Sequence, residues 1–294
     1  MDRNEKVNDL VNKITDHELR NELINLVNQL ELKLAEQQTQ NKKLKQKLKE
    51  QEKQKEKLIS FTIHELRTPL TAIKAYTNLM ILSPIIETKA EEISEIINLE
   101  IDRLSSLIND LLDLIKLEAN EFRLFCEKID LSVIINQSLA LIKVLADMAG
   151  IKIDINLPEK LPLVWGDRNK LVQVFTNLFS NAIKFSPDQS KIDVTLEVLD
   201  TDDPKIKKQG ATNFKNHKVI LINIQDHGLG ISNADLKLLF QKFKQIAGVK
   251  GRYKGTGLGL MISKEIVLKH QGNIWITSKL NKGTTISFYL PVFS

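Results

Sequence analysis

The sequence predicts an α+β multidomain protein, in which an N-terminal coiled coil leads into a dimerising helical hairpin and then a two-layer α/β sandwich. Three observations support this fold class. Residues 1–58 contain neither proline nor glycine and carry apolar residues at helical spacing. Two further apolar stripes, before and after Ser83-Pro84, have helical spacing as well. From Phe122 onward, short β-prone runs alternate with helical segments, which is typical of a sandwich.

The composition limits the class of protein. Hydrophobic residues make up 42% of the 294 positions, enough for a core, and the net charge of +5 does not favour a nucleic-acid partner. Cys126 is the only cysteine, so no intrachain disulfide can form, which suits a reducing compartment. With no long apolar run and no signal peptide, a cytoplasmic location is expected, and any membrane contact would pass through a missing segment or a partner.

The N-terminal region, residues 1–58, carries a heptad seam from Leu23 to Leu58. Its positions advance by four or three residues at every step, which favours a coiled coil over a single surface helix. Four polar members weaken the seam: Gln37, Asn41, Gln51 and Lys55. The next apolar stripe runs through Ile59 and Ile63, so the seam changes phase before His64. We interpret this stutter as a junction that passes strain or rotation onward.

Residues 59–120 are predicted to form a helical hairpin. The apolar positions of its first helix are Ile59, Ile63, Leu66, Leu70, Ile73 and Met80. A turn at Ser83-Pro84 separates it from a second stripe between Ile86 and Ile115. Two helices cannot bury two such stripes alone, so we expect a homodimer in which two hairpins form a four-helix bundle. Asn120 is the expected hinge after it.

His64 lies one residue off the first stripe, about 100° round the helix, so its side chain should meet solvent. Glu65 follows it, and a carboxylate near an imidazole can take its proton and make the other ring nitrogen a nucleophile. Pro69 cannot donate a backbone bond to Glu65, so the helix is expected to bend or loosen there. A lone His–Glu pair would more often be ordinary helix surface.

The region 121–294 is predicted to mix strands and helices. Strands are expected at 122–126, 150–155, 192–198, 218–225, 272–278 and 284–290. Helices are expected at 131–148 and 258–270, and between a cap at Asp167 and Phe185. The polar run 199–217 is expected to be a flexible surface insertion.

Three runs in this region have chemistry suited to a nucleotide. Asn177, Asn181 and Lys184 share one helix face, where amide oxygens suit Mg²⁺ and lysine suits phosphate. Asp226 can accept a hydrogen bond from an exocyclic amine, and Gly228 and Gly230 let the backbone approach a base. A glycine-rich turn into a helix N-terminus offers N–H groups to phosphate, without Rossmann spacing. Its residues are Gly255, Thr256, Gly257, Leu258, Gly259 and Leu260.

The run His64-Glu65-Leu66-Arg67-Thr68-Pro69-Leu70 resembles the phospho-acceptor box of sensor histidine kinases. Four further boxes resemble the same family in the same order, and together they cover about residues 59–291. They are the N box (177–185), the first glycine box (226–231), the F box with Phe240 and Phe243, and the second glycine box (255–260). The resemblance implies a phosphotransfer domain at 59–120 and an ATP-binding domain at 121–294.

The resemblance also implies roles for individual residues. His64 would receive a phosphoryl group from ATP, Glu65 would be the base, and Thr68 would orient a water for phosphatase activity. The phosphoryl group would pass to an aspartate on the receiver domain of a separate response regulator. Asn181 would bind Mg²⁺ and Asp226 the adenine amine. The remaining nucleotide-lining positions implied are Asn177, Lys184, Phe185, Gly228, Gly230, Ile231, Thr285 and the six residues of the second glycine box.

Parts of the sequence are also compatible with two other functions. One is an ATPase of the gyrase and chaperone superfamily, but Asn177 stands where those enzymes have an acid that activates water. The other is a non-catalytic scaffold, against which the intact nucleotide boxes argue. The family often has an arginine two residues after the second phenylalanine of the F box, and here that residue is Gln245. Its phosphate contact would then fall to a basic residue within 244–254.

Overall fold

The computed structural model describes residues 17–82, 90–209, 218–236, 238–240 and 257–293. The chain divides into two compact units, residues 1–64 and 65–294, and each is considered by itself. Helix α2 (His17–Leu82) supplies the described part of the first unit and the start of the second. The helix continues through Pro69 without interruption. The predicted turn at Ser83-Pro84 lies outside the described residues.

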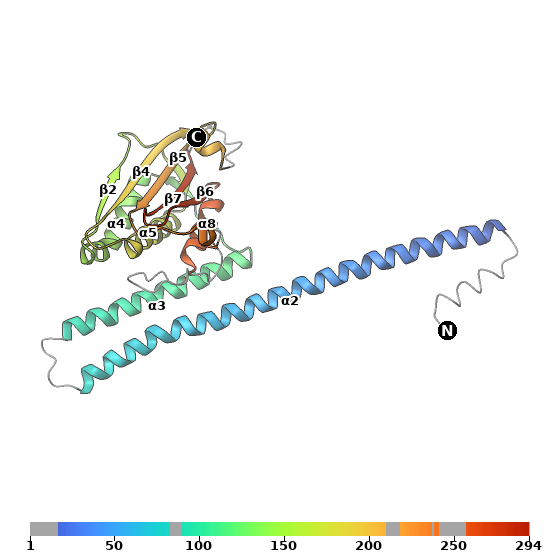
Figure 1. Cartoon of the computed structure of the whole chain (residues 1–294), viewed down its shortest axis with the longest axis horizontal. Coiled ribbons are helices and arrows are strands. Elements are labelled where there is room, and N and C mark those ends of the chain that lie inside the picture. The colour runs from blue at the N-terminus through green and yellow to red at the C-terminus, as the bar shows by residue number, and fades with distance from the viewer. Residues whose placement is uncertain (1–16, 83–89, 210–217, 237, 241–256, 294) are drawn as a thin grey trace. The chain divides into compact units, whose positions relative to one another are not determined.

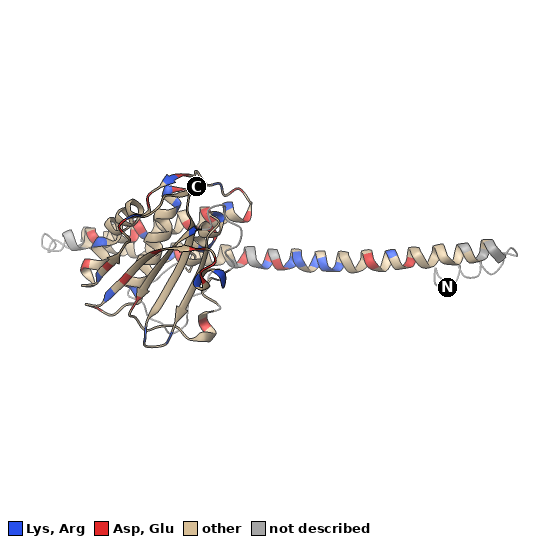
Figure 2. Cartoon of the chain, turned by 90° about the horizontal axis from the view of Figure 1, so that it is seen from above, with Lys and Arg blue, Asp and Glu red and all other residues tan. Residues whose placement is uncertain are grey.

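Basic and acidic residues are interleaved along the N-terminal part of α2 (Figure 2). This mixture is typical of a solvated helix. The seam residues Leu30, Leu34, Leu44 and Leu48 are 57–59% exposed in the single chain. The helical part of the prediction is confirmed for residues 17–58, whereas the coiled coil needs a second helix and stays a prediction.

Helix α3 (Ala90–Glu118) ends where Asn120 adopts a left-handed conformation, with φ of 56°. Asparagine tolerates this conformation better than most residues and often ends a helix in this way. The buried face of α3 differs from the predicted stripe. Leu107 and Leu114 are 3% and 1% exposed, whereas Ile108 and Ile115 of the stripe are 44% and 48% exposed.

The second unit contains a five-stranded sheet with the strand order β2-β4-β5-β7-β6 (Figure 1). Its strands are β2 (Lys152–Asn156), β4 (Lys191–Asp200), β5 (Lys218–Asp226), β6 (Asn273–Ser278) and β7 (Thr284–Pro291). β2 and β4 are parallel, and the other neighbours are antiparallel. Strands β1 (Glu127–Ile129) and β3 (Val164–Gly166) form a separate antiparallel pair.

Helices α4 (Leu131–Met148), α5 (Arg168–Phe185) and α8 (Gly259–Lys269) form the second layer, on one face of the sheet (Figure 1). The core between the layers includes Phe175 and Phe179 of α5 and Phe288 of β7, all fully buried. The Phe175 and Phe288 rings meet edge to face, with centroids 5.3 Å apart. The predicted two-layer α/β sandwich is therefore confirmed.

Helix α4 is the one described helix that is long and apolar enough to cross a membrane. Six of its residues are buried within the sandwich: Leu131, Ile134, Ile135, Ser138, Ile142 and Ala146. They recur at helical spacing, and α4 packs against α5. This is the pattern of a core helix.

Two of the predicted elements in this region are wrong. Residues 121–126 form no strand, since Phe122 is buried and Phe125 is held by a hydrogen bond from its N–H to Asp167 Oδ2 (2.9 Å). The run 199–217 is only partly a surface insertion. Its described part contains helix α6 (Pro204–Lys207), whose fully buried Ile206 packs in a cluster with Val219, Leu221 and Tyr289.

Helix α3 also meets α5 through the Asp113 contact, formed by Asp113, Lys170 and Gln173. Lys170 Nζ lies 2.7 Å from both carboxylate oxygens of Asp113, and Gln173 donates to Oδ2 at 2.9 Å. Lys170 Nζ also lies 5.0 Å from the centroid of the Phe122 ring. The carboxylate is 8% exposed and the lysine side chain 24%, so the pair is largely shielded.

His270 joins the end of α8 to the start of α5. The Asp167 N–H donates to its Nε2 at 2.9 Å, and its Nδ1 lies 2.7 Å from the carbonyl oxygen of Ile266. Nε2 must therefore be unprotonated and Nδ1 must carry the hydrogen. Burial lowers the pKa of His270. Asp167 in turn caps α5 by accepting the Lys170 N–H.

We expect acidification to weaken this junction. Because the folded pKa of His270 lies below its unfolded value, its stabilising effect is complete above about pH 6.5 and is lost as the pH falls toward the folded pKa. The free energy of unfolding should fall by about 1 kcal/mol between pH 7.5 and pH 5. Urea titrations at both values measure it, with His270→Gln as the reference that lacks the titrating group. Equal pH dependence in both chains would contradict the prediction.

Candidate functional site

The predicted phospho-acceptor box lies on α2. His64 and Thr68 are exposed, as expected for His64, whereas Glu65 is only 3% exposed. An ion pair of 3.8 Å joins Glu65 Oε2 to Nη2 of Arg103 on α3. The predicted base is therefore in contact with a cation that the sequence did not indicate.

The N box lies on α5, which presents its asparagines toward the N-terminus of α8. Asn177 Nδ2 donates to the hydroxyl of Ser263 at 2.8 Å, and Asn181 Nδ2 donates to Asn177 Oδ1 at 3.3 Å. A Cβ atom added to Gly259 would lie only 2.2 Å from Asn177 Oδ1. The absence of a side chain at Gly259 thus allows the two helices to approach at the predicted phosphate position.

Lys184 and Phe185 occupy the last turn of α5. Lys184 Nζ lies 4.8 Å from the centroid of the Phe185 ring, a cation–π contact. Burial lowers the pKa of Lys184, and the positive charge of Arg103 lowers it further. An anion beside this lysine would favour its charged form again.

Asp226 lies at the end of β5 and is 7% exposed. Its Oδ1 accepts the N–H groups of Gly228 (2.9 Å) and Thr284 (3.1 Å). Burial raises the pKa of Asp226, while these two hydrogen bonds act in the opposite direction. Both of these hydrogen bonds use Oδ1, so the carboxylate can offer Oδ2 to a ligand amine.

The first glycine box packs against the end of the N box. A Cβ atom on Gly228 would lie 2.2 Å from the carbonyl oxygen of Phe185. Gly230 has a φ of 67°, and the Ile231 N–H donates to Ser278 Oγ at 2.8 Å. Thr285 pairs with Gln225 in the β5–β7 register, beside Asp226. The structure thus brings the predicted adenine residues together at one edge of the sheet.

The second glycine box is described only in part, since Gly255 and Thr256 lie outside the described residues. Gly257 has a φ of 69°, Leu258 is buried, and Gly259 and Leu260 begin α8. Helix α7 (Asn233–Leu236) precedes the F box. Phe240 is half-buried, with Lys264 Nζ 5.1 Å from its ring centroid, whereas Phe243, Gln245 and the basic residues of 244–254 lie outside the description.

Several residues of the site were missed by the sequence analysis. Ser263 follows Gly259 by one helical turn, a spacing that could have revealed it, but the hydrogen bond from Thr284 to Asp226 depends on strand pairing. His227, for which no role was predicted, has Nε2 2.6 Å from Asp193 Oδ2. That bond, followed by the one from Lys191, lowers the pKa of Asp193.

The donor set fits Mg²⁺ bound in the presence of nucleotide. The described residues contain no group of three or more His, Cys, Asp or Glu side chains arranged to hold a metal. Mg²⁺ commonly takes one or two protein oxygens and completes its shell with phosphate oxygens and water. Asn181 donates its Nδ2 hydrogen to Asn177, and its amide oxygen can serve as the protein ligand of Mg²⁺.

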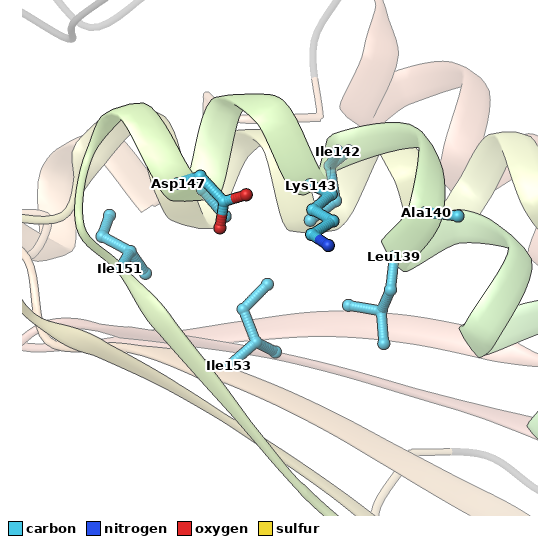
Figure 3. A pocket seen from close by; sticks show the side chains of 8 residues that line it. Leu139, Ala140, Ile142, Lys143, Asp147, Ile151 and Ile153 are labelled. Carbon is cyan, nitrogen blue, oxygen red and sulfur yellow. The ribbon is translucent and has the colours of Figure 1, made fainter.

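A pocket in another part of the sandwich lies between α4 and β2 (Figure 3). Its lining is mostly apolar, with Leu139, Ile142, Ile151 and Ile153, and includes Lys143 and Asp147. None of the predicted nucleotide residues lines it. It is therefore separate from the site described above.

Comparison with known families and proteins agrees with this geometry. Residues 54–120 match the model of the His Kinase A (phospho-acceptor) domain, and residues 166–294 match the model of histidine kinase-, DNA gyrase B- and HSP90-like ATPases. Two curated relatives from Caulobacter vibrioides are 35% identical over 78% of this chain. The non-motile and phage-resistance protein is covered over 26% of its length and histidine protein kinase DivJ over 36%. The chain thus spans about a quarter to a third of these relatives.

Solved structures share the fold. Histidine kinase AdeS of Acinetobacter baumannii is 24% identical, with a TM-score of 0.56 over 79% of this chain and 98% of that one. Full-length ShkA, solved with AMPPNP, is 22% identical, with a TM-score of 0.55 over 81% of this chain and 46% of that one. Histidine kinase ThkA, solved with the response regulator protein TrrA, is 21% identical, with a TM-score of 0.53 over 79% of this chain and 60% of that one.

The two family models fall on the two parts of the chain that carry the candidate residues. The phospho-acceptor model covers His64, and the ATPase model covers Asn177, Asp226 and Gly259. The fold and the curated relatives agree with both assignments. The chain therefore belongs to the sensor histidine kinases of two-component systems.

Proposed function

We propose that this chain transfers the γ-phosphoryl group of ATP to His64 and then to an aspartate of a response regulator receiver domain. The observation that carries the proposal is that Asn177 and Asn181 meet the N-terminus of α8. The buried carboxylate of Asp226, which could accept a hydrogen bond from the adenine amine, belongs to the same unit. The complex of ThkA with a response regulator, and the names of the curated kinases, support the choice of acceptor.

The chemistry balances with groups on this chain. The bond between the γ-phosphorus and its bridging oxygen breaks as a bond to one His64 ring nitrogen forms, and ADP leaves. The proton on the other ring nitrogen passes to Glu65, which acts as base. Phosphotransfer then breaks the N–P bond and forms an acyl phosphate on the regulator, and the proton held by Glu65 returns to the imidazole. Most of the acceleration comes from positioning and electrostatic stabilisation.

The nucleotide-binding residues divide by the part of ATP they would contact. Asp226 accepts a hydrogen bond from the adenine amine. The base is lined by Phe185, Gly228, Gly230, Ile231 and Thr285. Asn177, Lys184 and the second glycine box contact the phosphates, and Asn181 holds Mg²⁺. Bound Mg²⁺ would neutralise charge on the phosphate oxygens. Because Asn177 is an amide, it cannot take a proton from water, which disfavours simple hydrolysis.

We propose a homodimer as the working form. Exposed apolar residues on both helices of the hairpin support it, including Leu70 and Leu79 of α2 and Ile101, Ile108 and Ile115 of α3, all 44–53% exposed. Pairing two hairpins would bury these surfaces in a four-helix bundle. The proposed domain limits are 1–58 for the coiled-coil linker, 59–120 for phosphotransfer and 121–294 for ATP binding. A cytoplasmic location, with any membrane contact through another segment or partner, remains part of the proposal.

Phosphatase activity toward the regulator is a second proposed activity. Thr68 is exposed one turn after His64, where its hydroxyl could orient a water toward an acyl phosphate. Release of inorganic phosphate from a phosphorylated regulator by the unlabelled chain measures this activity. If the chain does not accelerate that release, the phosphatase role is excluded.

The kinase proposal is tested with ATP labelled at the γ-phosphate. We expect label that is stable in base and labile in acid, because a phosphoramidate hydrolyses in acid. The label should be absent from His64→Gln, which retains the size of the side chain but has no ring nitrogen. Release of phosphate without protein label would instead identify an ATPase, and no binding of ATP would leave only a scaffold.

A further inference from the structure

Arg103 of α3 has buried donors that the described residues do not satisfy. Its Nη1 lies 3.6 Å from Glu100 Oε2 and its Nη2 lies 3.8 Å from Glu65 Oε2, both longer than a hydrogen bond. Its Nε and Nη2 are shielded from solvent and have no hydrogen-bond partner among the described residues. Buried donors without an acceptor are costly, so they commonly mark the place of a ligand or a change of partner.

A second cation lies near this guanidinium. The charge of Arg103 lowers the pKa of Lys184, after the larger effect of burial, so the two positive groups are close enough to repel each other. Lys184 belongs to the N box, which we assign to phosphate. Two partly buried cations from different helices, with unsatisfied donors on one of them, form a favourable site for an anion of high charge.

We propose that Arg103 is a catalytic residue that contacts an oxygen of the transferring γ-phosphoryl group together with Lys184, exchanging its contact with Glu65 for the phosphate. The inference rests on the proposed function. The planar guanidinium can give two parallel hydrogen bonds to phosphate oxygens and stays charged throughout. The exchange would also release the Glu65 carboxylate from its ion pair with Arg103. Phosphate capture would thus be coupled to release of the proposed base.

The first test is the rate of label uptake at His64. Arg103→Gln should lower it about 100-fold or more, the loss expected when one donor that stabilises charge in a transition state is removed. Arg103→Lys keeps the charge but has no planar fork, so an intermediate loss of about tenfold is expected. Lys116→Gln, which removes an exposed cation from the same helix, is the matched control and should label at the parent rate. A rate within threefold of the parent in both Arg103 variants would overturn the inference.

The second test separates phosphate contact from a structural role. In a His64→Gln background, where no transfer occurs, Arg103→Gln should weaken ATP binding about tenfold and leave ADP binding within twofold, since only ATP has the γ-phosphoryl group. An equal loss for both nucleotides, or no loss for either, would overturn the contact. If Arg103→Gln has a lower melting temperature than the parent, the ATP and ADP affinities are measured for Arg103→Lys in the same background, and the same criteria apply to them.

The two proposals fail in different ways. If the parent chain binds ATP but acquires no label at His64, the kinase function fails and the inference fails with it. If the parent is labelled and the Arg103 variants are labelled at the same rate, only the inference fails.

Discussion

Replacing Asp226 with asparagine is expected to weaken ATP binding at least about 100-fold while the fold survives. The amide oxygen can still accept the N–H groups of Gly228 and Thr284, which now bond to Oδ1. The amide nitrogen then takes the place of Oδ2 and presents a donor to the donor amine of adenine. The loss of a charge-assisted hydrogen bond, about 1.5–3 kcal/mol, adds to this mismatch.

The same change should alter base preference, because guanine presents a carbonyl oxygen where adenine has its amine. The ratio of ATP to GTP affinity should therefore fall in Asp226→Asn, as measured by calorimetry with both nucleotides. Asp154→Asn, which removes an exposed carboxylate from β2, is the control and should keep the parent ratio. Burial raises the pKa of Asp226, so removing its charge should not lower the melting temperature. ATP affinity within threefold of the parent would exclude Asp226 from adenine recognition.

Gly259→Ala is expected to lower the kinase activity about 100-fold and to change the stability little. The new Cβ would lie 2.2 Å from Asn177 Oδ1 and 2.8 Å from its Cγ, so the asparagine side chain must take another rotamer. That movement breaks its bonds to Ser263 and Asn181 and displaces the amide from the phosphate position. The obstacle is the end of a side chain, so the backbone need not move. Label uptake and thermal unfolding of the same sample measure the two effects.

Gly228→Ala provides the contrast for this prediction. There the new Cβ would lie 2.2 Å from the carbonyl oxygen of Phe185, which is backbone and cannot rotate away. We expect this variant to lose several kcal/mol of stability as well as nucleotide binding. If Gly259→Ala were destabilised as much as Gly228→Ala, the new Cβ would not be accommodated by a change in the Asn177 rotamer.

Elements with local signals were predictable from the sequence. Helix α5 begins after the cap Asp167 and ends at Phe185, as predicted, because capping chemistry and apolar spacing lie within the helix itself. The predicted helix at 131–148 has the same limits as α4.

Features that depend on distant contacts were missed. Residues 122–126 have strand propensity, but they have no strand neighbour, and Phe122 packs instead beside Lys170 and Lys269. The buried position of Ile206 depends on Tyr289, which is far away in sequence. Arg103 occupies an ordinary position in an amphipathic helix, and only its distance from Glu65 shows its environment. The predicted roles of individual site residues stay predictions.

The Asp113 contact has a consequence for mutagenesis of the boundary between α3 and α5. Parting the two helices would return the carboxylate and the ammonium group to water together, so regained hydration would offset most of the lost attraction. A single substitution does something different, because it leaves one shielded charge behind without its counterion. The loss in free energy of unfolding measured for such a single variant would therefore exceed the free energy needed to separate the two helices. The contact fixes the relative position of α3 and α5 more than it stabilises their packing.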